Sequence, residues 1–237
     1  MDEAARRSEV DPEQQARRVM ELLDEAYGRP VWHQRLLALE ELVLTILSQH
    51  TSDVNSGKAF DTLRERFPTW EQVLEAPAAD VIDAVRSCGL ANQKGPRIQA
   101  ALAEIEAREG RLSLDRMAQL PTDEVLAYLT SMHGVGPKTA ACVLMFSLGR
   151  PYMPVDTHVH RISKRLGLIG PTTSADDAHV VLNELLPAED LYPFHINLIR
   201  HGRQVCHAQR PECPQCPLLQ VCPHGQGLLG MREPEGR

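Results

Sequence analysis

A glycine-rich break between two helical patterns is the feature that most constrains how this chain can fold. The segment TDEVLAYLTSM before the break and the apolar segment after Pro137 both have the composition of helices. Thr122 is expected to cap the first helix, and Pro137 suits the first position of the second. Gly134 and Gly136 allow the positive φ angles that a tight turn requires. The pattern predicts a helix, a tight turn and a second helix.

The rest of the chain also predicts helices. No stretch shows sustained alternation of apolar and polar residues with β-branched side chains, as half-buried strands do. Pro96 is expected to delay one helix so that it begins near Gly95. We therefore expect an all-α protein. Residues that suit the start of a helix recur elsewhere, at Asp11, Ser52 or Asp53, Thr69 with Gln72, and Ser174.

Composition and charge narrow the classes of function. The chain has 237 residues, 43% of them hydrophobic and 4% aromatic, as in soluble globular proteins. Its formal net charge of -7 excludes a protein coated with basic residues, so any DNA contact must be local. The start of the sequence lacks a secretory apolar region, and no apolar run reaches the ~18 residues of a membrane span. We expect a cytoplasmic protein, nucleoid-associated in a bacterium, without membrane contact.

Four of the six cysteines lie close together near the C-terminal end of the chain. Such clustering without a secretory signal favours a metal centre over disulfides and over unpaired structural thiols. Four thiolates can hold a zinc ion or an iron–sulfur cubane, and the spacing alone does not choose between them. The predicted ligands, spaced C-x6-C-x2-C-x5-C, are Cys206, Cys213, Cys216 and Cys222.

The turn Gly134-Val135-Gly136 is a candidate phosphate site. A helix start exposes unpaired backbone N–H groups and carries a partial positive charge, so the turn can hold a phosphate without a basic surface. The same short glycine motif also occurs in ordinary helix–helix turns. The motif alone leaves both interpretations open.

Lys138 and Asp156 carry the chemical content of this region. A helix start and partial desolvation both favour the neutral amine of Lys138, the form that attacks carbon and makes Schiff bases. The alternative is an ordinary solvated lysine. Asp156 either caps the helix that follows it or stabilises positive charge and handles a proton near a reacting sugar.

With these motifs in hand, the chain resembles the endonuclease III-type DNA glycosylases of the helix–hairpin–helix superfamily. The resemblance covers roughly residues 15–222. It rests on HGVGPKTA, on PVDTH after it, and on the C-x6-C-x2-C-x5-C loop, in that order. In this family the cysteine loop holds a 4Fe-4S cluster, so the resemblance assigns that cluster to the four cysteines.

The resemblance also implies two helical domains. One is a six-helix barrel domain over residues 30–150 that contains the hairpin. The other combines residues 11–29 with residues 151–222 and carries the cluster. We expect residues 1–10 to be disordered and residues 223–237 to form a flexible tail.

The implied activity is that of a bifunctional DNA glycosylase and AP lyase that removes oxidised pyrimidines from duplex DNA. By resemblance, Lys138 attacks C1′ of the damaged nucleoside, Asp156 assists departure of the base, and the Schiff base permits β-elimination. The implied partner is double-stranded DNA with damaged pyrimidines or abasic sites, and we expect a monomer.

The family fills the gap left by a flipped nucleotide with a polar residue and an apolar wedge, which correspond here to His50 and Leu90. His50 stands where glutamine is usual, and the neighbouring Gln49 is expected to compensate. Gly134 to Gly136 would grip a phosphate. The loop between the first two cysteines keeps Arg210 as a DNA contact but carries Glu212, where relatives are often basic.

Three alternatives remain open at this point. The first is a weakly active or non-catalytic paralogue that binds damaged DNA. The second is a glycosylase with another lesion preference. The third is a helical interaction protein stabilised by zinc.

Overall fold

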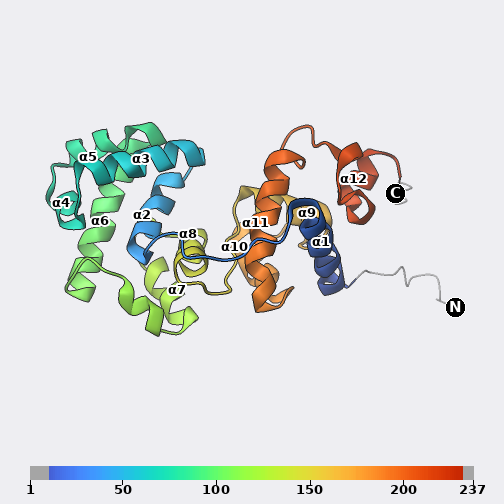
Figure 1. Cartoon of the computed structure of the whole chain (residues 1–237), viewed down its shortest axis with the longest axis horizontal. Helices are drawn as coiled ribbons and strands as arrows, with labels where there is room; N and C mark the ends of the chain where they lie inside the picture. Colours follow the sequence, from blue (N-terminus) through green and yellow to red (C-terminus); the bar gives the residue numbers. More distant parts are fainter. Residues whose placement is uncertain (1–10, 232–237) are drawn as a thin grey trace. The chain divides into compact units, whose positions relative to one another are not determined.

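The structure is a computed structural model that describes residues 11–231 (Figure 1). The segment 1–10, expected to be disordered, lies outside the described residues, as does 232–237 of the expected tail. The described part consists of α-helices, a few short 3-10 helices and one π-helical turn joined by turns and loops, and it contains no strand, in agreement with the predicted all-α fold. Its α-helices are α1 (Pro12–Tyr27), α2 (Ala38–Ser48), α3 (Asp53–Arg66), α4 (Trp70–Glu75), α5 (Ala78–Ala84), α6 (Ala91–Glu109), α7 (Thr122–Thr130), α8 (Pro137–Cys142), α9 (Thr157–Leu166), α10 (Ala175–Glu184), α11 (Ala188–Gln204) and α12 (Pro223–Leu228).

Side-chain caps begin four of the helices at the residues that the sequence indicates. The side chains of Asp11, Ser52 and Ser174 each accept a hydrogen bond from the first turn of their helix. Thr69 forms a capping box with Gln72. Each cap satisfies an N–H group that would otherwise lack a partner at the helix start.

Two expectations about helix starts are wrong. Thr122 does not cap α7, because Pro121 occupies the cap position and Thr122 is already helical. Pro96 does not delay α6, which begins at Ala91. The carbonyl of Leu90 accepts bonds from the backbone N–H groups of Gln93 and Lys94, so the first turn closes before Pro96. Pro96 then removes only one bond from a long helix.

Residues 33–150 form one compact unit built from α2 to α8. The resemblance implies six helices, and this unit has seven α-helices, of which α4, α5 and α8 are short. Helix α2 packs against α3, α6 and α8. It is buried on most faces, as its continuous apolar sequence predicts, with its core side chains at Leu42, Ile46 and Leu47 fully buried.

The second unit combines the chain up to residue 32 with the chain from residue 151 onward. Helix α11 packs against α1 and α9, and α12 packs against α9. The segment 223–228 was expected in a flexible tail but forms α12. Pro223 suits its first position, and the sulfur of Cys222 accepts a hydrogen bond from the Gly225 N–H, so the helix is capped as well as packed. Among the described helices, none combines the length and apolar character needed to cross a membrane.

Candidate active site

The glycine turn joins α7 to α8 inside the unit of residues 33–150. Gly134 has φ of 79°, in the left-handed region. The backbone angle favours glycine there, and a Cβ would also lie 2.5 Å from Nε of Arg97, so that this side chain would have to move. Gly136, expected to need positive φ, is instead extended at φ −91° and ψ 178° and is the cap residue of α8. The turn therefore needs one left-handed glycine.

Val135 anchors this turn. Its side chain is buried, and its N–H donates to the carbonyl of Met132. Pro137 is the first residue of α8, as predicted. Val135 thus holds the turn in place, with the start of α8 directly after it.

Lys138 lies in the first turn of α8 and is half-buried. One helical turn later, burial raises the pKa of the Cys142 thiol, against the opposing effect of the nearby Lys138 amine. The thiol is therefore neutral at neutral pH.

A buried carboxylate on α2, that of Glu41, lies close enough to α8 to affect the Cys142 thiol. Glu41 is fully buried, and its negative charge helps to raise the pKa of the Cys142 thiol. Arg35 donates from Nε to Glu41 Oε2 over 3.1 Å and pairs with the other carboxylate oxygen, while Thr45 Oγ1 donates over 3.3 Å. No motif in the sequence predicts a role for Glu41. A glutamate inside a strongly apolar helix is the signal that could have found it.

Asp156 belongs to the other unit and caps α9. Its Oδ1 accepts a hydrogen bond of 2.7 Å from the N–H of Val159. The strand-like segment before it is tied to α10, because the N–H of Val155 donates to Nε2 of His179 over 3.0 Å. Met153 N–H likewise donates to Oδ1 of Asn183 over 2.6 Å. The half-buried carboxylate is therefore held from both sides.

His158 shares the first turn of α9 with the cap. Burial lowers the pKa of this half-buried imidazole. Arg161 NH2 lies 3.1 Å from its Nδ1. At neutral pH the imidazole is neutral and accepts this bond from the guanidinium.

Three of the residues predicted to contact DNA share an unusual backbone. Within the described residues, the non-glycine residues with positive φ are His50, Leu90 and Arg210, each at 52°. All three are exposed, with 48% of Leu90 accessible. Left-handed backbone at such residues costs conformational energy and is enriched at functional sites. Gln49 is instead half-buried, and its Oε1 accepts a bond of 2.7 Å from Arg97 NH1.

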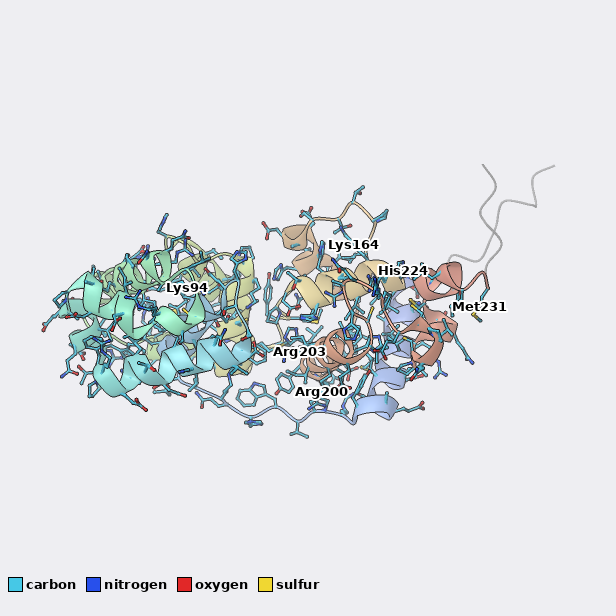
Figure 2. The ribbon with its side chains drawn as sticks, turned by 90° about the horizontal axis from the view of Figure 1, so that it is seen from above. Lys94, Lys164, Arg200, Arg203, His224 and Met231 are labelled. Atoms are coloured by element: carbon cyan, nitrogen blue, oxygen red, sulfur yellow. The ribbon has the colours of Figure 1, made fainter. Side chains whose placement is uncertain are left out.

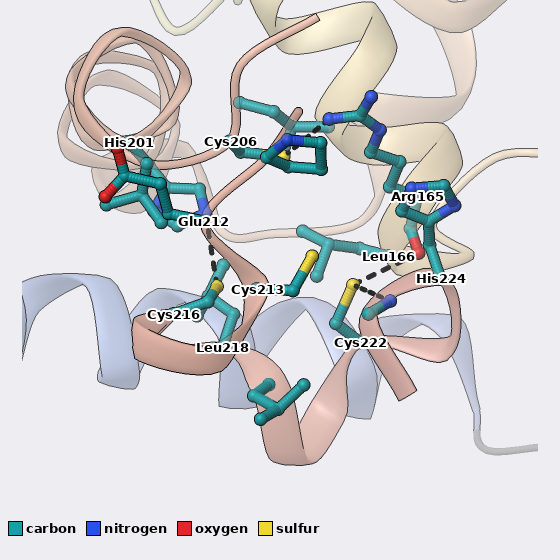
Figure 3. A pocket seen from close by; sticks show the side chains of 15 residues that line it. Arg165, Leu166, His201, Cys206, Glu212, Cys213, Cys216, Leu218, Cys222 and His224 are labelled. Atoms are coloured by element: carbon teal, nitrogen blue, oxygen red, sulfur yellow. Dashed lines mark hydrogen bonds between the residues drawn. The ribbon is translucent and has the colours of Figure 1, made fainter. Parts of the chain in front are cut away.

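The four clustered cysteines line one pocket in the second unit (Figure 3). None of them forms a disulfide. Gly225 lies beside two of the sulfurs, since a Cβ there would be in van der Waals contact with Cys222 at 3.7 Å and with Cys213 at 3.8 Å. Within residues 11–231, no group of three or more His, Cys, Asp or Glu side chains is arranged to hold a metal ion.

Polar groups surround the sulfurs of this pocket. Arg165 NH1 donates to the sulfur of Cys206 over 3.2 Å, and the Gly225 N–H donates to that of Cys222 over 3.4 Å. Nε2 of His201 lies 3.7 Å from the sulfur of Cys216 (Figure 3). Burial raises the pKa of the Cys216 thiol to about 11. Four thiols in one pocket, with N–H groups donating to the sulfurs of Cys206 and Cys222, are the residue types that ligate an iron–sulfur cluster, although their spacing in this structure does not itself form a metal-ion site.

Comparison with known proteins gives a consistent relationship. Residues 43–188 match the HhH-GPD superfamily of base excision DNA repair proteins. An Arabidopsis thaliana protein with a DNA glycosylase name is 39% identical over 165 residues, which are 70% of this chain and 56% of the plant protein. Endonuclease III of Thermotoga maritima is 35% identical over 194 residues, 80% of this chain and 84% of the relative.

A solved endonuclease III in a non-covalent complex with DNA is 30% identical, with a TM-score of 0.79 and coverage of 92% of this chain and 98% of that one. The sequence match spans more than half of the chain, and the structural match spans both of its units. The chain therefore belongs to the HhH-GPD superfamily of base excision DNA repair proteins, as a DNA N-glycosylase and AP lyase of the endonuclease III type.

Proposed function

We propose that this enzyme removes oxidised pyrimidines from duplex DNA and then cleaves the strand through a lysine Schiff base. The observation that carries the proposal is the half-buried Lys138 in the first turn of α8, four residues after the left-handed Gly134. An amine in that position combines nucleophilic character with a turn suited to the DNA backbone.

The chemistry uses Lys138 as the nucleophile. Its amine nitrogen bonds to C1′ of the damaged nucleoside while the glycosidic bond breaks, and the base leaves with the bonding electron pair and a proton. Opening of the sugar then gives the imine. Loss of a proton from C2′ expels the 3′ phosphate, and water later releases the lysine. The carboxylate of Asp156 stabilises the positive charge that develops on the sugar.

The target nucleotide must first leave the stack, which costs a few kcal/mol. We propose that His50 and Leu90 fill the space it leaves. Their exposure and their left-handed backbone support this assignment. We assign the phosphate contact to Gly134–Gly136 and a further DNA contact to Arg210, whose backbone is also left-handed.

We propose that Cys206, Cys213, Cys216 and Cys222 hold a 4Fe-4S cluster. The shared pocket, the absence of disulfides among these cysteines and the donors aimed at the sulfurs support four-thiolate ligation. When bound, such a cluster supplies a rigid core for the loop and can exchange an electron. The lyase steps above need no electron transfer.

A cleavage panel tests the proposed substrate and mechanism. Duplexes with dihydrothymine, thymine glycol, an 8-oxoguanine mispair or an abasic site are incubated with the native enzyme, Lys138→Ala and Asp156→Asn. The proposal expects cleavage of the two pyrimidine lesions and the abasic site by the native enzyme and loss of cleavage in Lys138→Ala. Preferred cleavage of the 8-oxoguanine mispair would show that oxidised pyrimidines are not the preferred substrate. Binding to the damaged duplex without cleavage would refute the proposed catalytic activity.

A further inference from the structure

Lys94 is a fully buried lysine that the catalytic scheme does not use. It lies in the first turn of α6, among the helices of the unit of residues 33–150 (Figure 2), and only 1% of it is accessible. Its Nζ donates to two backbone carbonyls, that of Leu47 over 2.8 Å and that of Cys88 over 2.9 Å. Lysine is rarely buried so completely, and here both bonded acceptors are neutral. Burial lowers the pKa of the amine, as expected without a carboxylate partner.

The two carbonyls belong to segments that are far apart in the sequence. Leu47 is in the last turn of α2, just before the loop that carries His50. Cys88 ends a short 3-10 turn, just before Leu90. The single amine of Lys94 therefore joins the ends of the two segments from which His50 and Leu90 project.

The backbone of Lys94 adds a further connection. Its N–H donates to the carbonyl of Leu90 over 3.0 Å. Leu90 is the cap residue of α6 and has left-handed φ. The side chain of Lys94 reaches the α2 loop while its main chain holds the Leu90 loop, so the two loops cannot move independently while these bonds persist.

Arg97, one turn further along α6, makes a parallel set of contacts. Its NH1 donates to Oε1 of Gln49, beside His50, over 2.7 Å. Its side chain also occupies the space that a Cβ on Gly134 would need. Helix α6 thus contacts the His50 loop twice and the glycine turn once.

We propose that Lys94 is a positioning residue that fixes the spacing between the His50 and Leu90 loops, so that both side chains enter the duplex together when a nucleotide is extruded. This inference rests on the proposed function. An apolar side chain of similar length would fill the same space, but only an N–H donor of this length bonds both carbonyls. The geometry of the two loops, rather than burial alone, accounts for a lysine at this position.

The test separates extrusion from chemistry by using one lesion in two contexts. Single-turnover cleavage of dihydrothymine is measured in a fully paired duplex and in the same strand within an unpaired bubble, where little extrusion is needed. Lys94→Met is expected to lower the rate on the paired substrate by at least about tenfold, and the rate on the bubble by no more than about twofold. Leu90→Ala should give the same pattern.

The matched control is Lys58→Met, which removes an exposed lysine from α3 and should leave the ratio of paired to bubble rates unchanged. Equal loss on both substrates in Lys94→Met would mean that Lys94 only stabilises the fold, and no loss on either would also overturn the proposal. If the native enzyme cleaves neither substrate, the proposed function itself fails.

A second variant and a second readout cover the case in which Lys94→Met does not fold. Lys94→Gln keeps an N–H donor, but its shorter side chain cannot reach both carbonyls, so the selective loss on paired DNA should persist. A native-like ratio in this variant would contradict the proposal. A 2-aminopurine base placed next to the lesion loses stacking when the nucleotide leaves the helix, so its fluorescence reports extrusion even without cleavage. This fluorescence should rise more slowly with either variant than with the native enzyme.

Discussion

Asp156 caps α9 through a hydrogen bond of 2.7 Å from the backbone N–H of Val159 to its Oδ1. The same carboxylate is the proposed electrostatic partner of the reacting sugar. The sequence leaves two roles open for Asp156. Capping needs only a side-chain oxygen that accepts a hydrogen bond, whereas stabilisation of the sugar needs the negative charge. Substitutions at this position can separate them, because an amide oxygen also caps a helix but carries no charge.

Asp156→Asn should keep the cap and lose the charge. We expect the rate of base release to fall by about 10²–10³-fold, with an unchanged melting temperature. Asp156→Ala loses both, so the free energy of unfolding should also fall by about 1 kcal/mol. Single-turnover base release and thermal melting of both variants check this. A full loss of activity in Asp156→Ala with an active Asp156→Asn would assign the residue to capping alone.

Cys213→Ser should prevent binding of the proposed iron–sulfur cluster. The expected result is loss of visible absorbance and of bound iron, because one of four ligands is gone. The matched control is Cys88→Ala, a buried cysteine in the other unit, which should keep both signals. Iron, sulfide and zinc analysis with absorbance spectra provides the measurement. A colourless native protein that contains zinc would overturn the cluster assignment.

Gly202 permits close packing of α11 on α9. A Cβ there would lie 2.6 Å from Nδ1 of His158 and 2.9 Å from Cδ1 of Ile162. Gly202→Ala should therefore destabilise the protein by about 1–3 kcal/mol. Gly57→Ala is the control, because nothing lies within 4 Å of its added Cβ on α3, and it should stabilise by about 0.5–1 kcal/mol. Urea unfolding of both variants measures the difference, and equal effects would contradict the packing argument.

Ionisation of Tyr128 should lower the stability of the unit of residues 33–150 at alkaline pH. Burial raises its pKa to about 12, with a contribution from the neighbouring Glu109 carboxylate. Because the folded-state pKa lies above the unfolded value of about 10, this contribution is fully present below pH 10 and is lost as pH rises through 12. Tyr128→Phe should therefore lose less stability than the native protein over that range.

Unfolding by urea at a series of alkaline pH values checks this difference. The lysines and the remaining tyrosines contribute equally to the pH dependence of stability in native protein and in Tyr128→Phe, so their contributions cancel in the comparison. Parallel curves for the two proteins between pH 10 and 12 would contradict the role of Tyr128.

The sequence predicts the local features of the fold well. Caps such as Ser52 and the first-turn Pro137 depend on neighbouring residues only, and the structure confirms them. Pro96 shows where local rules fail, because a carbonyl of the preceding loop starts α6 early. The sequence also does not show which glycine of the turn has positive φ. In the structure it is Gly134, while Gly136 is extended as the cap residue of α8.

Sequence motifs indicate only some residues of the candidate site. Lys138, Asp156 and the clustered cysteines stand in motifs that can be read along the chain. Lys94 and Glu41 could not be found in that way, since their roles come from partners on other segments or from burial that only the packed fold creates. Glu41 leaves one weak signal, a charged residue inside a strongly apolar helix, whereas Lys94 stands between Gln93 and Gly95 and leaves none.

Borohydride trapping on a duplex with a single abasic site tests the central claim most directly. Lys138→Arg keeps the positive charge but cannot form an imine, so it is the matched control for DNA binding. We expect the native enzyme to form a covalent protein–DNA complex, and both Lys138→Ala and Lys138→Arg to form none. A trapped complex of equal yield in Lys138→Ala would contradict the assignment of Lys138 as the nucleophile.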